Sequence, residues 1–156
     1  MADHWGVAFY KSQAAANQRL PLDGCVLITV ADPDKPGALD VARRFASLGF
    51  TIKATGGTQR FLAEHGIEAE RIFKEHEGRP NITDGIKNRE IHLVVNTPCG
   101  RTSVIDDSYI RKSAVKHKVP YITTIAAALA AVKGIAEFTQ EGGVVRSLQE
   151  YHANIT

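Results

Sequence analysis

Short apolar runs alternate with helical patterns along most of the chain, and this alternation restricts the possible folds more than any other feature of the sequence. Residues 26–30 are almost wholly apolar, which is typical of a strand that is covered on both faces, as in a parallel sheet. Gly49 is well suited to end the helix that follows this strand. That helix is indicated by apolar residues that recur at the i, i+3, i+4, i+7 spacing: Ala38, Val41, Ala42, Phe45 and Leu48.

The same alternation continues to residue 132. Further strands are expected at residues 51–54, 70–73, 91–96 and 120–122, and further helices at 58–65, at 82–88, from Asp106 or Asp107 to about 117, and after Thr123 or Thr124. Strand–helix alternation with short connections predicts an α/β fold: a doubly wound, three-layer parallel sheet of about five strands. Ligands bind such sheets beyond the carboxyl ends of the strands, so we expect the functional site there.

The first residues follow a different pattern. Residues 5–17 form a helical stretch that contains Trp5, and residues 18–24 have the composition of a linker. We therefore expect residues 1–23 to be a lead-in helix and linker, and residues 24–156 to be one domain. The pattern leaves two arrangements open for this helix: it packs on another part of a longer protein, or it folds back on its own domain.

The composition argues against several classes of protein. The net charge is +2 and no long run of lysine and arginine occurs, so we expect no binding to nucleic acid. The longest apolar run, residues 125–132, is too short to span a membrane, and no signal peptide opens the sequence. Cys25 and Cys99 stand apart from each other and from any metal-binding pattern, so we expect two reduced thiols in a cytoplasmic protein.

A turn rich in threonine and glycine lies between an expected strand and an expected helix: Thr55, Gly56, Gly57 and Thr58. Glycines let backbone N–H groups approach an anion, and the N-terminus of a helix carries about half a positive charge. Lys35 and Lys74 each follow another strand, so we expect both ammonium groups at the same edge of the sheet. Together these features favour a site for a phosphate monoester. The alternative is that the turn only caps a helix and that both lysines are solvated loop charges.

Other polar residues at this edge are candidates for reading a sugar or a base. Asn96 ends the fourth expected strand, and its amide offers donors and acceptors, although asparagine also forms turns. Asp106 and Asp107 are suited to accept hydrogen bonds from ribose hydroxyls and equally suited to cap a helix. The charged loop at residues 74–80 has no pattern for metal binding or nucleophile activation, so we expect no catalytic residue and no metal site.

From Cys25 to the C-terminus, the sequence resembles the methylglyoxal-synthase-like domain that ends the large subunit of carbamoyl phosphate synthetase. The run His-Glu-Gly-Arg-Pro at residues 76–80, with Ile-Lys-Asn at residues 86–88, is specific to this branch of the family. Residues 8–13 resemble the helix that leads into the domain, so the likeness covers nearly the whole chain. Further matching segments are residues 26–30, 34–35, 54–58, 81–85, 96–97, 111–114, 121–124 and 148–152.

The resemblance implies a regulatory domain that performs no chemistry itself. In this family the domain binds a nucleotide effector of the UMP and IMP class. The positions that hold the effector match two lysines, the threonine–glycine turn and the polar residues after the fourth strand: Lys35, Thr55, Gly56, Gly57, Thr58, Lys74, Asn96 and Asp107. A hydroxyl residue that usually follows is Pro98 here, which has no donor and leaves the identity of the nucleotide open. The ornithine side of the family's interface matches Tyr121 and Thr123.

The resemblance also implies that the chain is a fragment of a longer ligase, with Met1 as an introduced start. The ATP-grasp units of that enzyme, with their ATP and Mg or Mn ions, and its glutaminase small subunit would lie outside this chain. The parent enzyme makes carbamoyl phosphate for pyrimidine and arginine synthesis, and its regulatory domain contributes to oligomerisation, so we expect self-association.

Two other proteins of the same fold are alternatives. Methylglyoxal synthase eliminates phosphate from dihydroxyacetone phosphate, and it needs a carboxylate base in a Gly-Gly-Asp loop after the third strand. Residues 74–80 do not contain that motif. The cyclohydrolase half of a bifunctional enzyme of purine synthesis is the other alternative, and the ending at residues 148–152 argues against it.

Overall fold

A five-stranded parallel sheet forms the centre of the protein. The computed structural model describes residues 2, 4–97, 100–142 and 147–153. Every neighbouring pair of strands is parallel, and the spatial order is β3 (Glu70–Arg71), β2 (Thr51–Ala54), β1 (Cys25–Val30), β4 (Leu93–Thr97) and β5 (Tyr121–Ile122). The predicted fold class, a parallel sheet of about five strands, is therefore confirmed.

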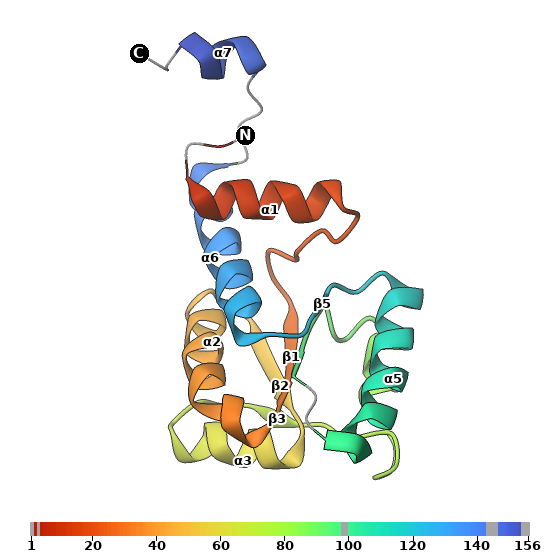
Figure 1. Ribbon diagram of the computed structural model, residues 1–156. Coiled ribbons are helices and arrows are strands. Elements are labelled where there is room, and N and C mark those ends of the chain that lie inside the picture. The colour runs from red at the N-terminus through yellow and green to blue at the C-terminus, as the bar shows by residue number, and fades with distance from the viewer. Residues whose placement is uncertain (1, 3, 98–99, 143–146, 154–156) are drawn as a thin grey trace.

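Helices cover both faces of this sheet, so the protein has three layers (Figure 1). One face carries α2 (Lys35–Ser47), α3 (Gly56–Glu64) and α6 (Ile125–Glu141), and the other carries α4 (Ile82–Lys87) and α5 (Gly100–His117). The remaining helices are α1 (Trp5–Ala15), the short 3-10 turn η1 (Asp32–Asp34) and α7 (Leu148–Ala153). The core is correspondingly divided into two clusters, one on each face of the sheet.

The central strand β1 is covered on both faces, as its apolar sequence predicted. Val26, Leu27 and Ile28 are all fully buried, because helices cover the side chains that point to either face. Burying such a side chain contributes roughly 1.5–3 kcal/mol, so these three residues anchor β1 firmly in the core. Its carboxyl end is consequently a rigid support for the residues that follow β2 and β4.

Helix α5 begins earlier than the sequence analysis predicted. The expectation that Asp106 or Asp107 caps this helix is wrong, because α5 starts at Gly100 and both aspartates lie inside it. Residues 101–105 contain neither proline nor glycine, so nothing in them opposes a helical backbone. Asp107 is therefore free to use its carboxylate elsewhere than on a helix end.

Helix α1 folds back on its own domain and packs against α6 (Figure 1). The Tyr10 ring stacks on Phe138 with their centroids 4.0 Å apart, and its hydroxyl donates a hydrogen bond to the carbonyl oxygen of Leu20 (3.0 Å). The two helices nearly touch, since a β-carbon on Gly134 would lie only 2.8 Å from the carbonyl oxygen of Gly6. Of the two arrangements left open for this helix, the structure has the second.

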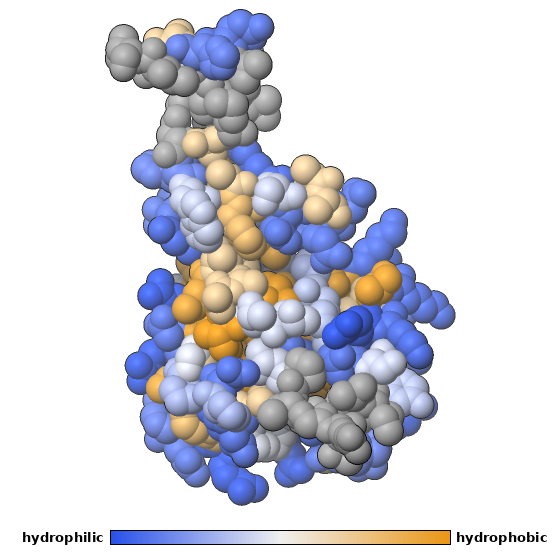
Figure 2. All heavy atoms as spheres, viewed as in Figure 1, coloured by the Kyte–Doolittle hydropathy of each residue, from blue (hydrophilic) through white to orange (hydrophobic). Residues whose placement is uncertain are grey.

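The surface is mainly hydrophilic on the face that Figure 2 shows. Apolar side chains gather there between α1 and α2, over the first turns of α6, where Ile125 and Leu129 are only partly buried. Within the described residues, no helix is both long enough and apolar enough to cross a membrane.

Candidate functional site

The threonine–glycine turn lies at the carboxyl edge of the sheet, directly after β2. Its first threonine, Thr55, shares a hydrogen bond of 2.9 Å with the hydroxyl of Thr29 on β1. The hydroxyl of Thr58 accepts a hydrogen bond from the backbone N–H of Val30 (3.2 Å) and lies 3.4 Å from the carbonyl oxygen of the same residue. Both turn threonines are buried, so the turn is fixed to the end of β1.

Lys35 brings a positive charge to the start of α3. Its Nζ lies 3.8 Å from the position that a β-carbon on Gly57 would occupy, so the ammonium group stands over the first turn of this helix. Lys35 also forms an ion pair of 2.7 Å with Asp32, whose side chain is 88% exposed. The hydrogen bond from Lys35 lowers the pKa of Asp32. An exposed carboxylate is an exchangeable partner, so an incoming anion can take its place.

Arg71 brings a second positive charge to the same helix end, and the sequence analysis missed it. Its guanidinium lies over Gly56, with Nε and Nη2 both 3.6 Å from the position of a β-carbon on that residue. The guanidinium carbon also lies 5.4 Å from the centre of the Phe73 ring. Arg71 ends β3, so the rule that drew attention to lysines after strands would have found it if strand ends had been included.

Two cations lie beside the N-terminus of α3, and one of them, Lys35, is ion-paired with the exposed carboxylate of Asp32. The N-terminal end of a helix is itself positive, and it is stabilised by anions rather than by cations. Lys35 and Arg71 therefore add to the positive potential of the first α3 N–H groups instead of neutralising it. The arrangement is suited to bind a phosphate group, because an arginine fork and a lysine supply charge-assisted donors.

Lys74 follows β3 by three residues and lies in the charged loop. Its backbone N–H donates a hydrogen bond of 2.9 Å to the carboxylate of Glu77, which closes a turn within that loop. Parallel pairing at Phe73 and Asn81 holds the two ends of the loop together. The assignment of the Lys74 ammonium group to the phosphate site stays a prediction.

The structure brings together three polar residues that the sequence analysis had assigned to two different functions. The Asn96 amide nitrogen donates hydrogen bonds to a carboxylate oxygen of Asp107 (2.8 Å) and to the hydroxyl oxygen of Tyr121 (2.6 Å). The Tyr121 hydroxyl in turn donates to the same oxygen of Asp107, and Arg111 donates to the other oxygen (2.9 Å). Asn96 and Asp107 are buried, whereas Thr123 is exposed beyond the end of β5.

This Asn96–Asp107–Tyr121 cluster also affects the ionisation of the phenol. Burial, together with the hydrogen bond to the Asp107 carboxylate, raises the pKa of Tyr121 to about 12. The hydroxyl consequently keeps its proton at neutral pH and continues to donate it to Asp107. Pro98 and Cys99, which follow β4, lie outside the described residues.

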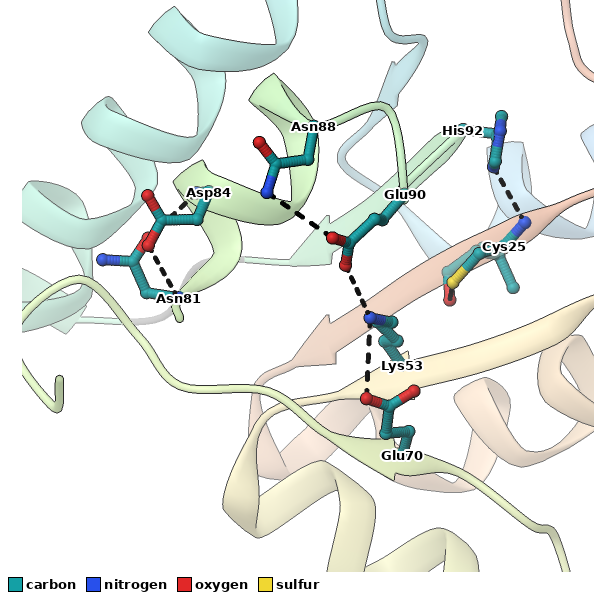
Figure 3. Close-up of polar contacts among 9 residues, drawn as sticks. Cys25, Lys53, Glu70, Asn81, Asp84, Asn88, Glu90 and His92 are labelled. Carbon is teal, nitrogen blue, oxygen red and sulfur yellow. Dashed lines mark hydrogen bonds and ion pairs between the residues drawn. The ribbon is translucent and has the colours of Figure 1, made fainter. Parts of the chain in front are cut away.

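A second polar cluster lies on the side of the sheet toward α4 (Figure 3). Lys53 on β2 contacts the carboxylates of Glu90 (3.1 Å) and Glu70 (3.6 Å), and so links β2 to β3 and to the segment before β4. Burial opposes the charge on Lys53, but the hydrogen bond to Glu90 and both carboxylate charges raise its pKa overall. Cys25 lies nearby with its backbone N–H bonded to His92 Nδ1 (3.0 Å), and burial raises the pKa of its thiol. These contacts are structural ties rather than a reactive centre.

A hollow of about 410 Å³ lies away from the threonine–glycine turn, at the other end of β2. Its apolar floor includes Phe50 and Ile52, and two glutamates, Glu68 and Glu70, stand at its rim. In the part of the chain that the structure describes, no three histidine, cysteine, aspartate or glutamate side chains lie close enough together to hold a metal ion.

Relatives of known identity resemble this chain over nearly its whole length. The family model described as an MGS-like domain matches residues 37–123. The "Carbamoyl phosphate synthase large chain, C-terminal section" of Aquifex aeolicus is 50% identical over 153 residues, which cover 95% of this chain and 28% of that protein. The "Carbamoyl phosphate synthase large chain" of Gemmatimonas aurantiaca is 48% identical over 150 residues, which cover 96% of this chain and 14% of that protein. The chain thus spans between 14 and 28% of the length of these relatives.

Solved structures share the fold at lower identity. Methylglyoxal synthase from Elizabethkingia anophelis superposes with a TM-score of 0.59 at 20% identity, covering 72% of this chain and 79% of that chain. A crystal structure of ForH superposes with a TM-score of 0.57 at 22% identity, covering 78% of this chain and 81% of that chain. Likenesses at this level of identity establish the fold alone.

Proposed function

The chain belongs to the MGS-like domain family, and we propose that it is the regulatory domain of a carbamoyl phosphate synthase large chain, with a nucleoside monophosphate as its effector. The observation that supports this most directly is the pair of cations, Lys35 and Arg71, over the two glycines that begin α3. A phosphate monoester carries a charge of about −1.5 to −2 near neutral pH, and two cations with a helix N-terminus approximately balance that charge.

The proposed phosphate site also contains the buried turn threonines. Their hydroxyls hold the turn against β1, so the backbone N–H groups of Gly56 and Gly57 keep a fixed direction. Lys74 completes the proposed site from the adjacent loop. Fixed donors lose little conformational entropy on binding, which favours a small charged ligand.

We further propose that the isolated chain catalyses neither carbamoyl phosphate synthesis nor methylglyoxal formation. The carboxylate of Glu77, which lies in the loop after β3, accepts a hydrogen bond from the N–H of Lys74 and so serves that loop's own turn. ATP and its metal ions would act in the rest of the large chain. The remaining partners that we propose are that rest of the large chain, the glutaminase small subunit and further copies of the chain, all in the cytoplasm.

The output of such a site is conformational. An effector shifts an enzyme between two states only if its affinity for the two states differs. We propose that the surface near Tyr121 and Thr123 transmits this difference to the rest of the large chain, because β5 is an edge strand of the sheet and its Tyr121 contacts Asn96 at the carboxyl end of β4.

A thermal-shift panel tests this proposal with UMP, IMP, uridine and inosine. A ligand at about 100 times its dissociation constant stabilises the native state by about 2.7 kcal/mol. For a domain of this size, that raises the melting temperature by about 5–10 °C. We expect such a shift with UMP or IMP and none with uridine or inosine. Equal shifts with nucleosides and nucleotides would refute a phosphate-dependent site.

A further inference from the structure

The Arg71 guanidinium is held beside an aromatic ring and a helix start instead of beside a carboxylate. Within the described part of the chain, it has no hydrogen bond and no ion pair. Arg111 offers a comparison, because its guanidinium carbon lies 5.6 Å from the centre of the Tyr121 ring, yet it also donates a hydrogen bond to Asp107 (2.9 Å). The N–H donors of Arg71 are therefore left for solvent or for a ligand.

The direction of the Arg71 side chain follows from the alternation of side chains along an extended segment. Ile72 is buried in the core cluster on the side of α4 and α5. Arg71 and Phe73, its two neighbours, consequently point to the other side of the sheet, where α3 begins. The backbone between them is fixed, because the N–H of Ile72 donates to the carbonyl oxygen of Ala54 (3.0 Å) and Phe73 pairs with Asn81. Both side chains thus extend from a firm support toward the start of α3.

The guanidinium turns mainly its flat face to the first residue of α3. Its Nε and Nη2 lie 3.6 Å, and its Cζ lies 3.7 Å, from the position that a β-carbon on Gly56 would occupy. Three nearly equal distances are expected when the face of the group is directed at Gly56, and not when one N–H edge is. Phe73 lies on the same group, with its ring centre 5.4 Å from Cζ, although the Phe73 side chain is 37% exposed. The N–H edges of Arg71 consequently point past Gly56 and not into it.

We propose that Phe73 is a positioning residue of the phosphate site: its ring holds the Arg71 guanidinium at the start of α3, so that two N–H groups reach two oxygens of one phosphate. This inference rests on the proposed nucleotide site and specifies how that site holds its phosphate. A contact through two parallel hydrogen bonds needs a planar fork, which lysine lacks. A guanidinium that is already held loses little conformational freedom on binding. Phe73 therefore strengthens binding through Arg71 and does not contact the phosphate itself.

The support is measurable without any ligand, by ¹⁵N relaxation of the Arg71 side chain in the full chain. The Nε–H signal of Arg71 is assigned by its loss in Arg71→Lys. We expect its order parameter to fall below about 0.6, the range of flexible groups, in Phe73→Leu, and to keep the parent value in Phe73→Tyr, which retains the ring. Tyr109→Leu is the matched control, since Tyr109 is another exposed aromatic residue and lies on α5. An order parameter that is equal in the parent and in Phe73→Leu would overturn the inference.

The effect on binding is measured by calorimetric titration of UMP and of ribose 5-phosphate, which carries a phosphate and no base. We expect Phe73→Leu to weaken the binding of both ligands about two- to fivefold, the value of an exposed contact between a cation and a ring, and Phe73→Tyr to retain the parent affinity. Adding Phe73→Leu to Arg71→Met should change the affinity by less than about 1.5-fold, because the ring acts only through Arg71. The melting temperature of each variant checks its folding.

Two results of these titrations would contradict the role of Phe73. A loss of affinity for UMP without a loss for ribose 5-phosphate would show that the ring contacts the base. An equal effect of Phe73→Leu in the parent and in Arg71→Met would show that the ring acts independently of Arg71. If none of UMP, IMP and ribose 5-phosphate binds the parent while the order parameter still falls in Phe73→Leu, the proposed function fails and the support of Arg71 by Phe73 stands.

Discussion

Removing either cation at the start of α3 should weaken nucleotide binding strongly without unfolding the domain. The variants are Lys35→Met and Arg71→Met, because methionine keeps most of the apolar stem and removes only the charged group. Lys35 Nζ lies 6.0 Å from the centre of the Phe61 ring and the Arg71 guanidinium carbon lies 5.4 Å from that of Phe73, so methionine keeps apolar bulk beside each ring. Lys116→Met serves as the control, since Lys116 is an exposed lysine in the last turn of α5, at the end of that helix farther from β4 in the sequence.

The expected magnitude follows from the type of contact. A charge-assisted hydrogen bond contributes about 1.5–3 kcal/mol, which corresponds to about a ten- to hundredfold increase in the dissociation constant for each variant. The bond to Asp32 that Lys35 must give up lies at an exposed side chain, so it reduces the gain only slightly. Affinity should also fall as salt rises, because the site lies at an open edge of the sheet.

Calorimetric titration of UMP and IMP into the parent and the three variants measures these effects, and the melting temperature of each variant checks its folding. Wild-type affinity in both Lys35→Met and Arg71→Met would refute the phosphate site at α3. Loss of affinity in Lys35→Met alone would retain the site and remove Arg71 from it. A loss of similar size in Lys116→Met would show a general effect of charge instead of a site.

Two further predictions concern the fold. Gly134→Ala should destabilise the domain by about 1–3 kcal/mol, because its β-carbon would meet the carbonyl oxygen of Gly6 at 2.8 Å and force α1 away from α6. Urea denaturation, followed by the fluorescence of Trp5, the single tryptophan, measures this change in stability. An unchanged denaturation midpoint would contradict the contact between the two helices. Asp84 should stabilise the fold above about pH 4 and lose that effect as the pH falls through about 2, because hydrogen bonds from Arg79 and the backbone N–H of Asn81 lower its pKa from 3.8 to about 2. Denaturation of the parent and Asp84→Asn at several pH values checks this, and a difference that stays constant down to pH 2 would exclude the proposed pH dependence.

The layers of the fold were predictable because burial leaves a direct mark on the sequence. The unbroken apolar run of β1 and the spaced apolar residues of α2 each correspond to surfaces that are buried in the structure. The start of α5 was not predictable in the same way. Asp106 and Asp107 are good capping residues, and capping preference alone cannot show that a helix has already begun at Gly100.

The candidate site was predictable only where each residue follows a strand. Thr55 and Lys35 satisfy that rule, and their neighbourhood follows from parallel topology. The contact between Asn96 and Tyr121 depends on the register of β4 with β5, in which Val94 pairs with Tyr121. Nothing in a single sequence specifies that register, because β5 has only two residues. Arg71 was missed because a charged residue at the end of an exposed edge strand also serves to discourage aggregation.

Helix α6 connects the carboxyl edge of the sheet to helix α1. It starts three residues after the last strand, where the hydroxyl of Thr124 caps it through the N–H of Ala127 (3.2 Å), and its 17 residues form an arm about 26 Å long. The middle and C-terminal turns of α6 pack against α1, where Gly134 lies beside Gly6 and Phe138 stacks on Tyr10. A rotation of about 5° at Thr124 would therefore carry the outer end of this arm, together with α1, through about 2 Å. A displacement of that size is sufficient to change how two packed surfaces fit together.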